Sequence, residues 1–292
     1  IIYGEYRRHC AHIQEALLSL LKEARGALGE CGLYVGVTGS GSINLGKALG
    51  IEFVQEVVAV ASALKAAAPQ TDVAIELGGE DAKIIYFKDG LDERMNGVCA
   101  GGTGSFIDQM AALMQTDAQG LNAYAEDYKE IYPIAARCGV FAKSDIQPLI
   151  NEGATKPDLA ASIFQAVVNQ TISGLACGKP IRGCVAFLGG PLHFLPELRK
   201  AFIRTLRLTP ENAVHPENSH LFAAMGAALE VSAIQPVKLE RLIAQLEKGV
   251  KLRFELKRLP PLFENQQEYD EFSNRHAKAV VAKGKLSEYS GD

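Results

Sequence analysis

The spacing of apolar positions alternates between a helical and an extended period in the first part of the chain. Residues 8–27 carry apolar side chains three to four positions apart, as on one face of a helix. Residues 32–38 form a nearly continuous apolar run that enters a Gly-Ser-Gly-Ser turn at 39–42, which predicts a buried strand. Residues 54–68 fit a helix that ends before Pro69, since proline disfavours helical backbone in the preceding residue.

Three short extended segments follow, and they predict an antiparallel unit. A strand at 72–77 stops at the turn Gly78-Gly79-Glu80-Asp81, and a second strand at 82–87 resumes after it. A third strand at 94–98 leads into a predicted helix at 105–114. We therefore expect a three-stranded antiparallel unit that is followed directly by a helix.

The next region returns mainly to helical spacing. We predict helices at 145–151, 157–176, 196–206 and 219–231, and a strand at 184–188. Gly189-Gly190-Pro191 follows that strand as an exit loop. Helices that follow strands, with glycines at the strand ends, predict an α/β fold with helices on both faces of the sheet.

The character of the chain changes after Ser232, where charged and proline-punctuated sequence begins. Helices are predicted at 238–248 and 269–283, separated by the helix-breaking pair Pro260-Pro261. We place a boundary near Ser232 and interpret residues 233–292 as a C-terminal extension or linker.

Composition narrows the class of protein. With 292 residues, 48% hydrophobic side chains and a net charge of -4, the chain can bury one large core or two linked cores. There is no lysine- or arginine-rich stripe with interleaved aromatic residues, so we expect no nucleic-acid partner. The longest apolar runs contain charged residues, so we expect no membrane span and a cytoplasmic location.

Two of the six cysteines have a sequence context that suits metal binding or a reactive thiolate. Cys99 and Cys138 each precede small residues and a helical pattern, where backbone amides and the helix dipole stabilise a thiolate or a metal-bound sulfur. Two such cysteines make half of a four-thiolate site, and a symmetric dimer would supply the other half. The alternative is a packing role, which we expect for Cys31, Cys177 and Cys184.

Glycine turns at strand ends are the second candidate feature. The turn at 78–81 offers consecutive amides to a phosphate, and Glu80 or Asp81 could hold Mg²⁺ directly or through water. Gly189 and Gly190 would allow a base or ribose to approach the backbone. The glycines at 101–104 do not follow the dinucleotide fingerprint, and no P-loop pattern is present, which disfavours a nicotinamide site.

These segments together resemble a known family. The matching segments are Glu76-Leu-Gly-Gly-Glu-Asp-Ala-Lys83, Cys99-Ala-Gly-Gly-Thr-Gly-Ser-Phe106, Cys138-Gly-Val-Phe-Ala-Lys-Ser-Asp145 and Phe187-Leu-Gly-Gly190. They resemble the BadF/BadG/BcrA/BcrD ATPase family, in particular activators of 2-hydroxyacyl-CoA dehydratases. The resemblance implies the α/β fold of actin, sugar kinases and chaperones, with ATP between two domains. It would make residues 1–70 the remainder of the first subdomain and residues 71–232 the second.

The resemblance also implies a site and a set of partners. Cys99 and Cys138 of two copies would hold one [4Fe-4S] cluster in a homodimer, and ATP hydrolysis would drive one electron into a dehydratase-like iron-sulfur enzyme of anaerobic metabolism. A ferredoxin or flavodoxin would be the donor. Phosphates or Mg²⁺ would lie near Gly78, Gly79, Glu80 and Asp81. The cleft would be lined by Gly102, Thr103 and Gly104, and adenosine would approach Gly189 and Gly190.

The chain departs from the family pattern in ways that keep other functions open. The family's opening Gly-Ile-Asp-Xaa-Gly-Ser-Thr hairpin does not precede the first helix, so we expect a fragment of a longer multidomain member with little ATPase activity. Glu76, Glu80 and Lys143 replace the aspartate, the glutamine and an acidic residue that are more usual in activators. The alternatives are a scaffold with a degenerate nucleotide site, or a sugar kinase using Asp108 or Asp145.

Overall fold

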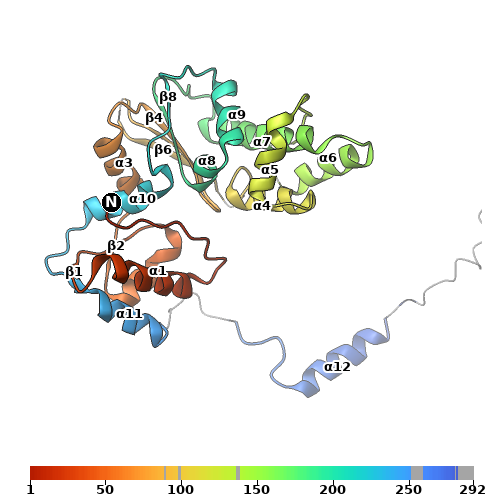
Figure 1. Cartoon of the computed structure of the whole chain (residues 1–292). Helices are drawn as coiled ribbons and strands as arrows, with labels where there is room; N and C mark the ends of the chain where they lie inside the picture. The colour runs from red at the N-terminus through yellow and green to blue at the C-terminus, as the bar shows by residue number, and fades with distance from the viewer. Residues whose placement is uncertain (89, 98–99, 136–138, 251–258, 280, 282–292) are drawn as a thin grey trace, which may run out of the picture. The chain divides into compact units, whose positions relative to one another are not determined.

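The computed structural model describes residues 1–88, 90–97, 100–135, 139–250, 259–279 and 281. The chain divides into two compact units, Ile1–Leu252 and Arg253–Asp292. The first unit holds a lobe built on a five-stranded sheet, the sheet lobe, and a lobe of three helices and short strand pairs, the small lobe (Figure 1).

The sheet is mixed, and its centre consists of the strands predicted from sequence. Its strands are β4 (Val73–Leu77), β5 (Ala82–Tyr86), β6 (Asp92–Met95), β7 (Val185–Leu188) and β8 (Ala213–Val214), in the order β6-β5-β4-β7-β8. β4, β5 and β6 are antiparallel neighbours, which confirms the predicted antiparallel unit. β4, β7 and β8 run parallel, with Glu76 opposite Leu188. Consequently β4 and β7 end at the same edge of the sheet.

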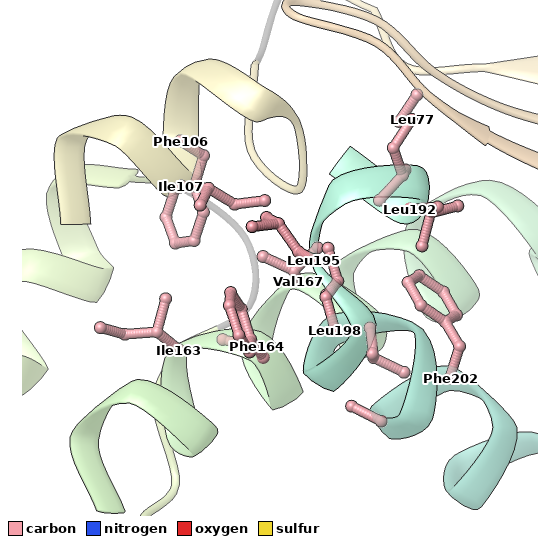
Figure 2. Packing of buried hydrophobic residues seen from close by; sticks show 14 of the residues in the cluster. Leu77, Phe106, Ile107, Ile163, Phe164, Val167, Leu192, Leu195, Leu198 and Phe202 are labelled. Carbon is pink, nitrogen blue, oxygen red and sulfur yellow. The ribbon is translucent and has the colours of Figure 1, made fainter. Parts of the chain in front are cut away.

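Helices cover both faces of this sheet because successive strand residues point to opposite sides. One face carries Ile75, Leu77 and Phe187 against the larger helical layer. Figure 2 shows Leu77 with side chains from that layer, including Phe106, Phe164 and Phe202. The layer comprises α4 (Gly104–Leu113), α5 (Ala118–Tyr124), α6 (Gly139–Asn151), α7 (Lys156–Thr171), α8 (Gly190–Phe194) and α9 (Pro196–Leu206). The predicted layered α/β architecture is confirmed.

The opposite face packs on two helices that approach each other very closely. Ala74 and Leu188 lie against α3 (Glu56–Ala67) and α10 (Phe222–Glu230). A Cβ built on Gly226 of α10 would stand 1.6 Å from the Ala59 carbonyl oxygen of α3, so only glycine allows this approach.

Helix α7 is the most buried helix of the core. Together with the π-helical turn Ile172–Ala176 it is the one described segment that has the length and hydropathy of a membrane span, and 67% of that window is buried inside the protein. Its apolar side chains, including Ile163, Phe164 and Val167, belong to the sheet-lobe core. Packing within the protein therefore accounts for its apolar character.

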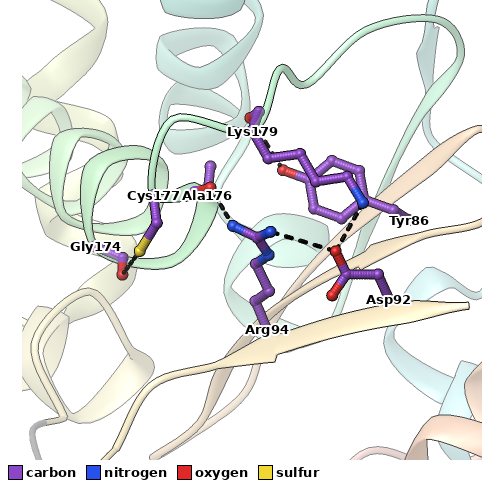
Figure 3. A network of polar contacts seen from close by, with 7 residues as sticks. All are labelled: Tyr86, Asp92, Arg94, Gly174, Ala176, Cys177 and Lys179. Atoms are coloured by element: carbon purple, nitrogen blue, oxygen red, sulfur yellow. Dashed lines mark hydrogen bonds and ion pairs between the residues drawn. The ribbon is translucent and has the colours of Figure 1, made fainter.

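The π-helical turn after α7 is tied to the sheet by polar contacts, which Figure 3 shows. Asp92 of β6 accepts from Lys179 at 2.7 Å and from Arg94 at 3.3 Å, and Arg94 also donates to the Ala176 carbonyl. The Lys179 ammonium lies 4.2 Å from the centre of the Tyr86 ring. These contacts hold β6, the strand that leads toward Cys99, against the end of α7.

The small lobe combines segments from both ends of the first unit. It contains α1 (Ile13–Leu28), β1 (Gly32–Leu33), β2 (Gly36–Val37), α2 (Ile43–Leu49), β3 (Glu52–Phe53), β9 (Val237–Lys238) and α11 (Leu239–Glu247). β9 pairs with β1, and Leu242 and Leu246 of α11 share a core with Leu45 and Leu49 of α2. Residues predicted as an extension after Ser232 thus complete this lobe, and the boundary between units falls after Leu252.

Local geometry explains three further differences from the predicted elements. The helix predicted from residue 8 starts at Ile13, because Cys10 and Ala11 have φ of 44° and 68°, outside the helical region. The strand predicted at 32–38 divides into β1 and β2, which pair with different strands. The exit loop predicted at 189–191 becomes helical from Gly190, with Pro191 in the first turn.

The second unit contains one described helix, α12 (Gln266–Ala277). The Asn265 side chain caps it by accepting from the Glu268 amide at 3.0 Å. Phe272 of this helix packs on Phe263 with ring centroids 5.2 Å apart.

Candidate functional site

The two predicted Gly-Gly turns lie side by side at one edge of the sheet. β4 enters Gly78-Gly79 and its parallel neighbour β7 enters Gly189-Gly190. Gly189 has φ of +87°, and a Cβ on it would stand 2.1 Å from the Leu77 carbonyl oxygen. Both the backbone conformation and the close approach require glycine there. The carboxyl edge of parallel strands is where α/β sheets bind ligands.

The first turn of α4 is bonded directly to the turn after β4. The Gly104 amide donates to the Gly78 carbonyl at 2.9 Å, and the Ser105 amide donates to the Gly79 carbonyl at 2.7 Å. Thr103 is fully buried and donates its hydroxyl to the Ala100 carbonyl at 2.5 Å. Two amides at this helix start are therefore occupied by backbone carbonyls, and α4 is held rigidly against the turn.

A cavity of about 240 Å³ lies where these segments meet. Gly79, Gly104 and Gly190 stand in its wall, one from each of the three predicted glycine segments. Further wall residues include Tyr6, Arg8, Ser105, Asp108, Gln119 and Phe194. The other predicted binding residues are not part of the cavity wall: Gly78, Glu80, Asp81, Gly102, Thr103 and Gly189.

Asn96 clamps the turn that was predicted to meet phosphates. Its side-chain amide donates to the Glu80 carbonyl at 3.1 Å, and its oxygen accepts from the Ala82 amide at 2.7 Å. The Gly78 amide closes the turn by donating to the Asp81 carbonyl at 2.7 Å. The Glu80 and Asp81 side chains are therefore carried on a loop with a defined backbone.

A buried charge cluster lies behind this turn. Lys83 of β5 is almost fully buried, and its ammonium stands 2.6 Å from Glu56 of α3 and 3.8 Å from Glu76 of β4. The Glu56 carboxylate also faces Gly39, where a Cβ would come within 3.9 Å of it. The cluster thus lies between the predicted turn at 39–42 and strands β4 and β5 of the sheet.

Glu76 is the carboxyl group in this cluster that is hardest to ionise. Burial raises its pKa to about 7, and the Lys83 charge offsets only part of that effect. Its Oε2 atom has no hydrogen-bond partner among the described residues, and neither has the buried hydroxyl of Thr38. Lys83 pairs more closely with Glu56, so Glu76 remains the under-compensated partner.

A histidine cluster supports the second glycine turn. Ser219, which is buried, lies 2.8 Å from His193 Nδ1 and 3.1 Å from His215 Nε2, and its carbonyl accepts from the Gly189 amide at 3.1 Å. The rings of His193 and His220 have centroids 3.9 Å apart. Burial lowers the pKa of all three imidazoles, that of His215 to about 4, where the Arg199 charge adds to the effect. The cluster is therefore neutral at pH 7.

Comparison with known proteins assigns the family. A sequence model of the BadF/BadG/BcrA/BcrD ATPase family matches residues 5–231, well over half of the chain. The chain belongs to this family. The resemblance inferred from the glycine and cysteine motifs is thereby confirmed.

Named relatives in the family are dehydratase activators. The 2-hydroxyisocaproyl-CoA dehydratase activator of Clostridioides difficile is 29% identical over 197 residues, which are 66% of this chain and 71% of that protein. The (R)-2-hydroxyglutaryl-CoA dehydratase activating ATPase of Acidaminococcus fermentans is 32% identical over 124 residues, which are 42% of this chain and 47% of that protein. The second match spans about half of the relative's length.

Solved structures of family members confirm the actin-like fold. The activator of 2-hydroxyisocaproyl-CoA dehydratase from Clostridium difficile, solved with bound ADPNP, matches with a TM-score of 0.64 at 24% identity, covering 83% of this chain and 85% of that chain. Component A of (R)-2-hydroxyglutaryl-CoA dehydratase from Acidaminococcus fermentans matches with a TM-score of 0.64 at 25% identity, covering 74% and 82%.

Cys99 and Cys138, the predicted cluster ligands, lie outside the described residues. Within the described ranges, no group of three or more histidine, cysteine, aspartate or glutamate side chains is arranged to hold a metal ion. Gly139, which follows Cys138, lies beside α4: a Cβ on it would stand 3.5 Å from the Phe106 ring. The helix that begins after Cys138 therefore starts against the helix that follows the Cys99 segment.

The carboxylates of the sugar-kinase alternative are both engaged. Asp108 lines the cavity but forms a two-point ion pair with Arg8. Asp145 accepts from the Ala135 amide at 2.6 Å. Asp145 is not part of the cavity wall, and Asp108 faces the cavity as the partner of Arg8.

Three groups of functional interest could not be identified from sequence. Tyr6 and Arg8 reach the cavity from a segment without regular structure. The sequence places Lys83 in a predicted strand and Glu56 near the start of a predicted helix, and only tertiary packing brings the two side chains together. The spacing of the histidines predicts no cluster, because His193 of α8 and His220 of the 3-10 helix Ser219–Leu221 meet only in the folded chain.

Proposed function

We propose that this chain is a nucleotide-binding activator domain that passes one low-potential electron to a dehydratase-like iron-sulfur partner. The observation that carries the proposal is the convergence of Gly79, Gly104 and Gly190 on one cavity. Nothing lies within 4 Å of a Cβ built on Gly79, and the three atoms nearest to a Cβ on Gly190 all belong to Tyr6. Glycine at these positions lets a ligand approach the backbone, as a bound nucleotide requires.

Different residues would contact different parts of ATP and Mg²⁺. Gly78 and Gly79 would approach the phosphates, while Gly190 would approach the adenosine, with Gly189 fixing the turn behind it. Glu80 and Asp81 would hold Mg²⁺ from the clamped turn, directly or through water. Gly102, Thr103 and Gly104 would keep α4 against the phosphate turn.

Cys99 and Cys138 of two copies would bind one [4Fe-4S] cluster in a homodimer. Such a cluster supplies one-electron chemistry at a potential set by charge, hydrogen bonding and solvent exposure. The contact between Gly139 and Phe106 supports this pairing, because it brings the starts of α6 and α4 together. A ferredoxin or flavodoxin in the cytoplasm would reduce the cluster, and a 2-hydroxyacyl-CoA dehydratase-like protein would accept the electron.

A scaffold function with a degenerate nucleotide site remains the second candidate, and one contact favours it. The Tyr6 ring lies directly against Gly190, on the wall where adenosine would bind. A chain that never binds nucleotide could keep this contact permanently.

The test is anaerobic reconstitution followed by measurement of iron, acid-labile sulfide, oligomeric mass and Mg-ADP binding. We expect about four irons per dimer and a dissociation constant for Mg-ADP in the micromolar to millimolar range. Cys99→Ser and Cys138→Ser should each lose the iron. Cys177→Ser is the matched control, because Cys177 is an exposed free cysteine among the described residues. A protein that contains no iron, keeps the same oligomeric mass in both variants and binds no nucleotide would support the scaffold function instead.

A further inference from the structure

The segment that precedes α1 lies across the candidate nucleotide site. Residues 3–9, here called the strap, run between the sheet lobe and the small lobe (Figure 1). Tyr6 and Arg8 of the strap stand in the wall of the cavity that holds Gly79, Gly104 and Gly190. The strap is therefore part of the surface that a nucleotide would have to meet.

Tyr6 covers the wall where adenosine is proposed to bind. A Cβ built on Gly190 would stand 2.4 Å from the Tyr6 hydroxyl oxygen, so the phenol tip rests on the Gly190 backbone. The ring centroid lies 5.1 Å from that of Phe194 and 5.8 Å from that of His220. Gly190 is buried, and the three atoms nearest to a Cβ built on it all belong to Tyr6. An aromatic ring that rests on glycine backbone and is flanked by two other rings has the contacts that suit a purine base.

Arg8 fastens the strap to the sheet lobe. Both of its terminal nitrogens pair with the Asp108 carboxylate of α4, one of them at 3.1 Å. The pair is open to solvent, with 63% of the Arg8 side chain and 33% of the Asp108 side chain exposed. Exposed ion pairs contribute little free energy, so a ligand can displace this fastening.

The neighbouring arginine fastens the strap to the other lobe. Arg7 donates to both carboxylate oxygens of Glu23 in α1, at 3.0 and 2.9 Å, and to the Ser19 hydroxyl at 2.7 Å. Tyr3 adds a bond to Glu23 at 3.3 Å. Successive residues of an extended segment point to opposite sides, so Arg7 and Arg8 bridge the two lobes. The strap thus stays tethered to α1 when its contact with α4 is released.

We propose that the strap is an autoinhibitory element: Tyr6 occupies the adenosine-binding face of Gly190, and nucleotide binding requires release of Tyr6 and Arg8 from the sheet lobe. This inference rests on the proposed nucleotide site. A docked strap reduces the fraction of molecules able to bind, and apparent affinity falls by that fraction. The Cys10–Ala11 turn, in which both residues have left-handed φ, reverses the chain between strap and α1 and would serve as the hinge.

The first experiment measures Mg-ADP affinity by calorimetry for the reconstituted protein and its Tyr6→Ala and Arg8→Ser variants. Each substitution should tighten binding roughly two- to fivefold, as expected from loss of one weak surface contact. Tyr34→Ala removes an exposed tyrosine from the small lobe and should leave affinity unchanged. Weaker binding in Tyr6→Ala would mean that Tyr6 is a nucleotide contact, and unchanged binding would mean that it does not compete; either result overturns the proposal.

Hydrogen exchange over residues 3–9 provides a readout that separates the strap from the nucleotide site. Without nucleotide, Tyr6→Ala should exchange faster in this segment than Tyr34→Ala, and saturating Mg-ADP should speed exchange in the unmodified chain. Slower exchange with nucleotide overturns the strap proposal while leaving nucleotide binding intact. If neither the unmodified chain nor Tyr6→Ala binds Mg-ADP, the proposed nucleotide-binding function fails. The strap then has no inhibitory role, even where hydrogen exchange shows that it is docked on the sheet lobe.

Discussion

The Leu77 carbonyl oxygen occupies the place where any side chain on Gly189 would have to stand, 2.1 Å from the position of its Cβ. This contact joins the ends of the parallel strands β4 and β7 and sets the two Gly-Gly turns beside each other. The site therefore depends on a backbone contact between residues more than a hundred positions apart.

Gly189→Ala should unfold much of the site. The substitution meets the Leu77 carbonyl and forces alanine into φ of +87°, for a combined cost on the order of 3 kcal/mol. Urea unfolding measures this cost. The paired variant is Gly79→Ala: nothing lies within 4 Å of its Cβ, so stability should change by less than about 1 kcal/mol, while Mg-ADP binding weakens. Equal stability of the two variants would contradict the close approach at Gly189.

Glu76→Gln should change the pH dependence of stability. The folded pKa of Glu76 is about 7, against an ordinary value of 4.5, so the folded state holds a proton that the unfolded state loses between these values. Stability from this group is therefore lost as pH rises from about 4.5 to 7, by an amount on the order of 3 kcal/mol. Unfolding in urea at several pH values from 5 to 8 should show a smaller loss in Glu76→Gln than in the unmodified chain.

The control for Glu76→Gln is Glu30→Gln, which alters an exposed carboxylate. This control should follow the pH profile of the unmodified chain. Identical profiles for all three proteins would mean that Glu76 is ionised in the folded state at neutral pH.

Lys83→Met should be strongly destabilising. It leaves the Glu56 and Glu76 carboxyl groups without their shared cation in a buried setting, and removing one partner of a buried pair costs about 3–5 kcal/mol. Adding Glu76→Gln to Lys83→Met removes one of the stranded carboxyl groups and should recover part of that loss. Thermal unfolding of the single and double variants gives the coupling; strict additivity would mean that the two side chains do not interact.

Protonation of His215 should lower the stability of the protein in acid. Its folded pKa of about 4 lies below the ordinary value of 6.5, because of burial, the Arg199 charge and the adjacent His193 and His220 rings. The unfolded state therefore binds the proton first, and stability is lost as pH falls from 6.5 toward 4. His215→Gln should flatten the change in Tm between pH 7 and pH 5. His276→Gln, at the end of α12, is the control and should leave that change as it is.

Gly226→Ala should separate α3 from α10. A methyl group there would lie 1.6 Å from the Ala59 carbonyl, so the helices must move apart, at a cost of about 3 kcal/mol or more. Gly26→Ala is the matched control, because Gly26 lies inside α1 with nothing within 4 Å of its Cβ. Alanine at that helical position should raise stability by roughly 0.5–1 kcal/mol. Circular-dichroism melts distinguish the two outcomes.

Local sequence was sufficient to predict the elements that frame the site. The apolar run at 72–77 and the glycines at 78, 79, 189 and 190 identify strand ends, because chain reversal and strand periodicity are properties of neighbouring residues. The motifs around Cys99 and Cys138 indicated the family, although the two cysteines themselves lie outside the described residues.

Tertiary structure decided which of these elements meet and what faces them. Tyr6 on Gly190, Lys83 between Glu56 and Glu76, and the imidazoles around Ser219 join residues that are distant in sequence, and no local pattern encodes their contact. The same holds for α11, whose charged surroundings predicted an extension but whose leucines complete the core of the small lobe. Periodicity shows which face of an element is buried, whereas the partner of that face is set by packing across the whole fold.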